Sequence, residues 1–218
     1  MLRRFSAIEL LIALVVLLVS FPFIEPLRSG HLIISILLTL VLISALRAIV
    51  EPGAPMIIAS VFAAVAVGAR WINDYWPDLM PPEVFLVAAI LFVVFVVWNL
   101  LRFVLNASYI STNVLCAGIS AFLLLGLAWT FGYWLVAELS PNAFSFNVAA
   151  DAGANIDGFN GLYFSLITLC TVGYGDITPV SRVARMLAAM EALTGLLYVA
   201  VLIARLVAIH SSPNSSDE

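Results

Sequence analysis

Long uninterrupted runs of apolar residues, separated by short polar breaks, make up most of this chain. About 20 apolar residues cross a hydrocarbon core of roughly 30 Å as a helix, so runs near that length predict membrane spans. Six runs occur, at Ile8–Ile24, His31–Val50, Met56–Ile72, Val84–Leu105, Asn113–Leu139 and Val183–Ile209. The pattern predicts an all-α membrane protein with six transmembrane helices.

The breaks between the runs hold proline, glycine and acidic residues, which favour turns. Only the connection from Ser140 to Gly158 is long. We therefore expect a four-helix peripheral membrane domain at residues 1–105, a two-helix domain at residues 112–209 and a short polar tail at residues 210–218.

Composition agrees with a membrane protein and excludes several other classes. The 218 residues are 64% hydrophobic and 10% charged, whereas soluble domains carry about a quarter charged residues. All nine basic residues are arginine, against thirteen acids, so we expect no nucleic-acid partner. The two cysteines, Cys116 and Cys170, lie in apolar stretches and are interpreted as packing residues.

The arginines bear on topology. We expect the first run, which follows Arg3 and Arg4, to be a retained span and not a cleaved signal. With six spans and both termini in the cytoplasm, five arginines fall at inner ends and four at outer ends, which gives weak support from the positive-inside rule. The expected location is the cell membrane, as a multi-pass protein surrounded by lipid.

Between the last two spans lies an apolar stretch, Gly161–Leu169, that is too short to cross a bilayer. It leads directly into the polar turn Thr171–Asp176. Non-helical backbone at membrane depth is tolerated only where protein buries it or where it lines a water-filled path. We therefore expect one re-entrant pore helix followed by a pore-lining loop.

The loop reads Thr171, Val172, Gly173, Tyr174 and Gly175, a string that resembles the selectivity filter of potassium channels. Backbone carbonyls can replace the water shell of K⁺ if the chain alternates its conformation, and glycine allows positive φ at Gly173 and Gly175. Val172 and Tyr174 are expected to point away from the ion and to pack behind the filter. One loop cannot encircle an ion, so one filter per chain implies a homotetramer.

Residues from about Thr112 to Ile209 resemble the pore module of potassium channels. Ser165–Cys170 is similar to their pore helix, and Asp176–Pro179 is similar to the turn into their inner helix. The whole chain resembles the six-span, voltage-gated-like superfamily and, less specifically, short bacterial ion-channel proteins. The resemblance implies passive, K⁺-selective conduction, with K⁺ bound at Thr171, Val172, Gly173 and Tyr174 as the permeant ion, no other cofactor and no enzyme activity.

Two other functions stay open from sequence. One is a non-conducting or regulatory subunit that assembles with other pore chains. The other is a poorly selective cation pore. The presence of Tyr174 and Gly175 does not favour it, because changes in the filter sequence usually accompany lost selectivity in the family. A single-chain K⁺ transporter would need four such loops, and this chain has one.

Three residues could support the filter. A Tyr163 hydroxyl could bond Asp176 and brace the filter mouth, with an aromatic belt residue as the equal alternative. Glu191 lies within the sixth span, where an acid needs a partner or water. We favour a contact from Glu191 to the pore helix or filter backbone over a cavity-facing acid that concentrates cations.

The sixth span also holds candidate gating residues. Gly195 is either a hinge or a close-packing site. Leu196, Val199 and Ile203 recur at helical spacing, and by resemblance they line the cavity below the filter. Arg205 is expected to reach lipid headgroups.

The fourth span predicts weak voltage dependence. No basic residue lies between Val84 and Leu101, and Arg102 stands alone at one end of the span. The first four spans are interpreted as a packing domain around the pore, with an apolar ligand pocket as the alternative. Ala59, Ala63 and Ala66 of the third span would allow close helix approach.

Overall fold

The computed structural model describes residues 6–48, 54–76, 81–147 and 155–210. The basic start at Arg3 and Arg4 and the polar tail from Ser211 to Glu218 lie outside these residues, as do several of the expected turn residues. In the described part of the chain, six helices are long and apolar enough to cross a membrane, which confirms the expected spans.

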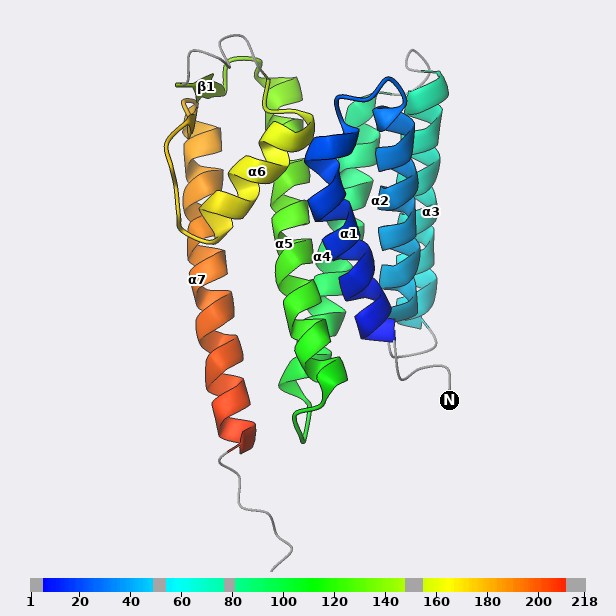
Figure 1. Ribbon diagram of the computed structural model, residues 1–218, viewed down its shortest axis with the longest axis vertical. Coiled ribbons are helices and arrows are strands. Elements are labelled where there is room, and N and C mark those ends of the chain that lie inside the picture. Colours follow the sequence, from blue (N-terminus) through cyan, green and yellow to red (C-terminus); the bar gives the residue numbers. More distant parts are fainter. Residues whose placement is uncertain (1–5, 49–53, 77–80, 148–154, 211–218) are drawn as a thin grey trace, which may run out of the picture.

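The first four helices form one bundle, called here the four-helix unit: α1 (Ser6–Ile24), α2 (Gly30–Ala48), α3 (Ala54–Tyr75) and α4 (Pro82–Leu105). Each helix packs against the next along the chain (Figure 1). Ala59, Ala63 and Ala66 are buried on α3, as expected of small residues at a helix contact. Pro82 stands at the first turn of α4, where its missing N–H costs nothing.

Helix α5 (Thr112–Leu139) joins the four-helix unit to the rest of the molecule. Its N-terminus is capped by Ser111, whose Oγ accepts a hydrogen bond from the Val114 backbone N–H at 3.3 Å. Helices α1 and α4 pack against one side of α5, and α6 and α7 contact it on the other (Figure 1).

The remaining elements are β1 (Phe144–Phe146), α6 (Gly158–Leu169), β2 (Ile177–Pro179) and α7 (Arg182–His210). Helix α6 begins near the α1–α2 connection and runs obliquely toward the middle of the molecule, and the chain then returns to β2 (Figure 1). We call the end that holds the α1–α2 connection, the start of α6 and the strands the mouth end.

The strands were not expected from the sequence. β1 and β2 pair antiparallel, with Phe144 opposite Pro179 and Phe146 opposite Ile177. Three-residue strands are too short to leave a period-two pattern, so hydrophobic periodicity could not have found them.

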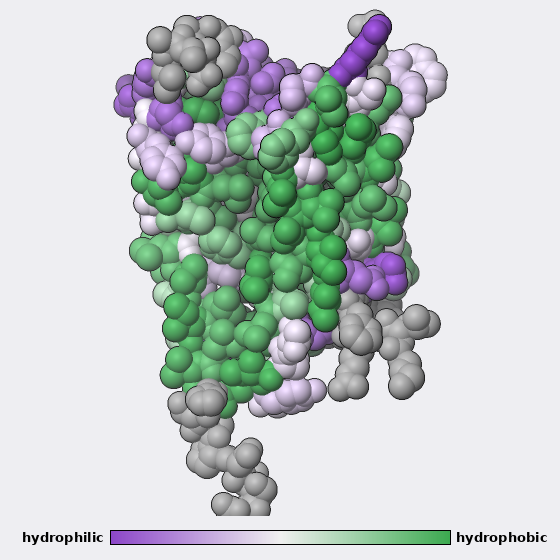
Figure 2. Space-filling view, viewed as in Figure 1, coloured by the Kyte–Doolittle hydropathy of each residue, from purple (hydrophilic) through white to green (hydrophobic). Residues whose placement is uncertain are grey.

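Hydrophobic side chains cover the middle of the visible face, and hydrophilic ones gather toward the mouth end (Figure 2). Burial differs sharply between helices: half of the span in α4 is buried, against 11% in α7. Apolar side chains that face outward are favourable in lipid or against another protein surface.

Candidate functional site

The backbone from Thr171 to Gly175 has the alternation expected of an ion-binding loop. Gly173 and Gly175 have φ of +55° and +80°, as the sequence predicted. Thr171 also has a positive φ, 57°, and is the one non-glycine residue with this conformation in the described part of the chain. Every second residue is therefore in the left-handed region, which is strained for threonine.

The end of α6 fixes this loop through its carbonyl groups. The Thr171 N–H donates to the Thr168 oxygen at 2.9 Å, and the N–H groups of Val172 and Gly173 both donate to the Ile167 oxygen, at 2.8 and 3.2 Å. These three backbone N–H groups therefore hold the first part of the loop against the end of α6.

The side chains of Val172 and Tyr174 are 51% and 74% exposed. Within one chain they therefore do not pack behind the loop as expected. Their cover by another chain stays a prediction.

A buried hydrogen-bond cluster holds α5, α6 and α7 together below the loop. Glu191 of α7 is fully buried, and its carboxylate accepts from the Ser165 hydroxyl of α6 at 2.6 Å and from the Tyr133 hydroxyl of α5. The Ser165 oxygen also lies 2.7 Å from the Gly126 carbonyl oxygen. Glu191 thus contacts α6 and does not face a cavity in this chain.

Three aromatic rings pack beside this cluster. Tyr133 meets Phe144 and Phe164 edge-on, with ring centroids 5.7 and 4.9 Å apart, and the Phe144 and Phe164 centroids lie 5.6 Å apart. The contacts join α5, β1 and α6, so the strand anchors the helix that carries the loop. Sequence reasoning missed Tyr133, whose partner Glu191 is 58 positions away.

At the mouth end, Tyr163 donates a hydrogen bond from its hydroxyl to Asp176 Oδ2 at 2.6 Å. The contact lies within one chain. It lowers the pKa of Asp176 below its usual value and raises the pKa of Tyr163 to about 12, because the hydrogen bond favours the carboxylate and the protonated phenol.

Asn147, directly after β1, is a further residue at the mouth that the sequence did not identify. Its backbone N–H donates to the backbone carbonyl oxygen of Asp176 at 2.7 Å, and its side-chain amide donates to the backbone carbonyl oxygen of Gly175 at 2.8 Å. The β1–β2 pairing places it there, so only the unexpected strands could have signalled its role.

The remaining candidates lie on α7. Gly195 packs against the end of α6, where an added Cβ would collide with the Leu169 carbonyl oxygen. Leu196, Val199 and Ile203 are 62%, 42% and 55% exposed, so they form part of an open apolar face of the chain.

Arg205, near the other end of α7, differs from expectation. Its guanidinium donates to the Ala107 carbonyl oxygen at 2.8 Å, in the connection between α4 and α5. One end of the guanidinium therefore binds within the protein, while the buried Arg205 Nε has no hydrogen-bond partner among the described residues.

Comparisons with known proteins concern this same part of the chain. The ion channel family matches residues 110–211, somewhat under half of the chain. Two-pore potassium channel 3 of Arabidopsis thaliana is 44% identical over 48 residues, which are 22% of this chain and 11% of that protein. Two pore potassium channel c of Oryza sativa subsp. japonica is 38% identical over 61 residues, 28% of this chain and 13% of that protein.

The chain therefore matches only a small part of the length of these curated relatives, and no solved structure matches it. The match spans α5, the mouth strands, α6, the loop and α7, and it indicates a channel and not an enzyme. Residues 110–211 are thus similar to the ion channel family, within a chain whose described part holds six helices that could cross a membrane.

Proposed function

We propose that this protein is a K⁺-selective channel that conducts passively through a homotetrameric pore. Each chain contributes α6 as a re-entrant pore helix and residues 171–175 as one quarter of the filter. The observation that carries the proposal is the alternation of positive φ at Thr171, Gly173 and Gly175.

The alternation matters because of what K⁺ requires. A dehydrated K⁺ ion is held by rings of backbone carbonyl oxygens. Alternate residues of the loop have positive φ, and its first N–H groups are bonded back to α6. Successive backbone carbonyls can then turn away from α6, toward the path of the ion. Thr171, Val172, Gly173 and Tyr174 are the proposed ligands, with Gly175 at the mouth.

The exposed surfaces of the single chain support assembly. Val172 and Tyr174 lack cover, and α7 exposes a long apolar face, which includes Met186, Met190, Leu193, Leu196, Leu197, Val199, Val201, Ile203 and Val207. Four copies around an axis would place four loops about one path and cover part of these surfaces. In that assembly Leu196, Val199 and Ile203 line the cavity below the filter.

Ion flux from purified protein in liposomes tests the proposal. We expect K⁺ to pass and Na⁺ to be excluded, and we expect the mass of the cross-linked particle to correspond to four chains. Equal K⁺ and Na⁺ flux would indicate a poorly selective cation pore, and absent flux from a folded tetramer would indicate a non-conducting subunit.

A substitution in the loop connects the flux to the filter. Gly173→Ala places a Cβ at φ +55° and should abolish selective K⁺ flux. Gly132→Ala, on α5 with open space around the added Cβ, is the matched control and should conduct as the unaltered protein does. Selective K⁺ flux that persists in Gly173→Ala would contradict the assignment of the filter.

A further inference from the structure

A carboxylate from the four-helix unit lies at the first turn of α6. Glu25, which follows α1, accepts a hydrogen bond from the Phe159 backbone N–H through Oε1 at 2.9 Å. The first amides of a helix have no partner within it. Glu25 thus supplies the acceptor that an N-cap side chain normally provides, from 134 positions away.

The local sequence of α6 fits this arrangement. Asp157 stands at the N-cap position but makes no side-chain capping hydrogen bond. Gly158 has a φ of +47°, and an added Cβ would collide with Glu25 Oε1. The missing local cap and the glycine both leave the first turn of α6 open to Glu25.

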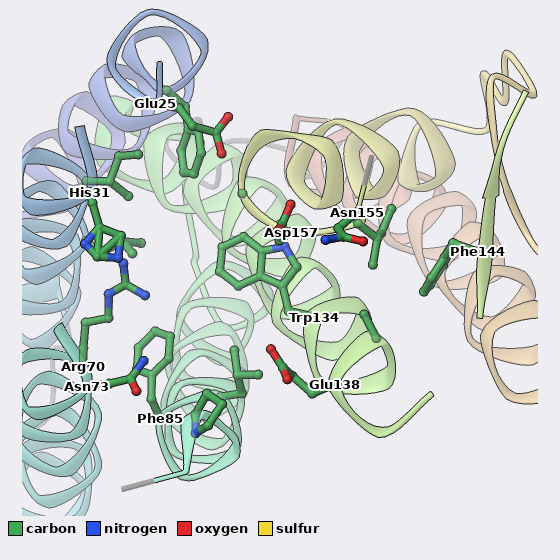
Figure 3. A pocket seen from close by; sticks show the side chains of 18 of the residues that line it. Glu25, His31, Arg70, Asn73, Phe85, Trp134, Glu138, Phe144, Asn155 and Asp157 are labelled. Carbon is green, nitrogen blue, oxygen red and sulfur yellow. The ribbon is translucent and has the colours of Figure 1, made fainter. Parts of the chain in front are cut away.

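The contact borders a cavity of about 640 Å³ between the four-helix unit and α5 with the start of α6. In Figure 3, His31 and Arg70 extend from α2 and α3 on one side, and Glu138 and Asp157 lie on the other. Together with Glu25, these four side chains are the titratable and charged groups that line the cavity. Glu25 itself is exposed, so protons from solution can reach it.

Helix α6 connects this contact to the loop. The helix is 12 residues long, with Glu25 at its first turn and the Ile167 and Thr168 carbonyls holding the loop at its last. A short hydrogen-bonded helix is a rigid element that can carry a displacement from one end to the other. A shift at its first turn therefore reaches the amides of Thr171, Val172 and Gly173.

We propose that Glu25 is a positioning residue for the pore helix, through which the four-helix unit and the proton concentration at the mouth end act on the filter. The conduction part of this inference rests on the proposed function, whereas the contact itself does not.

The direction of the pH effect follows from the surroundings of Glu25. Partial burial raises its pKa, the Phe159 N–H opposes that rise, and the charge of Asp157 adds to it. A carboxyl with a raised pKa in the docked state binds its proton more tightly there than when it is free, so protonation favours docking. Docking therefore weakens as pH rises through the Glu25 pKa, and the neutral carboxyl still offers an oxygen to Phe159.

Hydrogen exchange on the full chain in liposomes tests the contact without reference to conduction. In Glu25→Ala the Phe159 amide should exchange about tenfold faster, the size of a lost N-cap. Glu25→Gln keeps an acceptor oxygen and should restore protection. Glu138→Ala, at an acid that lines the same cavity from α5, should leave the Phe159 amide unchanged. Unchanged exchange in Glu25→Ala would overturn the proposal.

K⁺ flux between about pH 4 and 8 at the mouth end tests the consequence. Flux through the unaltered protein should fall as pH rises, Glu25→Gln should lose that pH-dependent component, and Glu138→Gln should keep it. A Glu25→Gln protein with the unaltered profile would contradict the proposal, and this variant also serves if Glu25→Ala does not fold. If the unaltered protein conducts no K⁺, the proposed function fails while the exchange result still decides the role of Glu25.

Discussion

Asn147 is the residue at the mouth whose role is most directly testable. Its side-chain amide is a donor to the Gly175 oxygen. Asn147→Ala removes that donor, and Asn147→Asp places a carboxylate against the carbonyl, which repels it. We expect K⁺ over Na⁺ selectivity, measured from reversal potentials, to fall in the order unaltered, Asn147→Ala, Asn147→Asp. Asn142→Ala, exposed in the same connection, should have no effect, and equal selectivity in all variants would contradict the role of Asn147.

Glu191 has two hydroxyl partners and no exposure, so its side-chain chemistry should decide stability. Ser165 has one hydroxyl proton for two acceptors, the Gly126 and Glu191 oxygens. A side chain that can both donate and accept suits this position.

We therefore expect Glu191→Gln to unfold close to the unaltered protein, because its amide offers both a donor and an acceptor. Glu191→Ala leaves the buried Tyr133 hydroxyl without its acceptor, while Ser165 keeps the Gly126 carbonyl, and should cost about 3 kcal/mol of unfolding free energy. Thermal unfolding in detergent measures both. An Ala variant as stable as the Gln variant would show that the cluster contributes nothing to stability.

Tyr163 and Asp176 give the mouth a defined acid sensitivity. The hydrogen bond from Tyr163 is the largest cause of the lowered Asp176 pKa. A lowered native pKa contributes stability above the usual carboxyl range and loses it as pH falls through the native value. Tyr163→Phe should therefore raise the Asp176 pKa toward its usual value, measured by carboxyl NMR, and reduce the part of the mouth's stability that is lost in acid. Tyr109→Phe, at an exposed tyrosine near the α4–α5 connection, should leave that pKa unchanged.

Among the elements, the crossing of α6 and α7 depends on the absence of a side chain at Gly195. A Cβ there would collide with the Leu169 carbonyl, which is backbone and cannot rotate away. Gly195→Ala should therefore destabilise the protein by roughly 1–3 kcal/mol, the usual cost of overpacking. Gly68→Ala on α3, where the added Cβ meets open space, should be neutral or stabilising. A free hinge at Gly195 would instead tolerate alanine without loss of stability.

The sequence predicted the helices because lipid leaves the backbone few alternatives. An apolar run of sufficient length must satisfy its own amides, so Pro82–Leu105 or Thr112–Leu139 follow from composition. Gly173 and Gly175 were predicted for a similar reason, since their conformation needs glycine.

Contacts between distant positions could not be predicted in that way. In the sequence, Glu25 is an acidic residue in a turn like any other, and only the folded chain places α6 beside it. The position of Asn147 depends on two strands of three residues each. The positive φ of Thr171 contradicts the usual preference of threonine and accompanies a hydrogen bond from its N–H to the Thr168 carbonyl oxygen of α6.

For the whole molecule, the charges of the four-helix unit lead us to predict weak voltage sensing. Each unit charge that crosses the membrane field contributes about 2.3 kcal/mol per 100 mV, and steep gating needs several per subunit. On α4 the basic residue is Arg102, in the last turn. Arg47 of α2 is paired with Glu9 of α1 at 3.2 Å, and Arg70 of α3 binds the Ser35 hydroxyl at 3.0 Å.

We therefore expect conductance of the reconstituted protein to change gradually with voltage over a wide range. Recordings across positive and negative potentials measure this directly. An e-fold rise in conductance within a few millivolts would contradict the expectation. Arg102→Gln, which removes the basic residue of α4, should leave the gradual curve nearly unchanged.

Helix α5 packs against α1 and α4 of its own chain, and only residues 106–111 separate α4 from α5. In each subunit of the proposed assembly, the four-helix unit would thus contact the pore helix α6 of the same chain. Unaltered and Glu25→Gln copies can be fused into one polypeptide in known ratios. The pH-dependent part of the K⁺ flux should then decrease in steps with the number of altered copies, whatever their order around the ring.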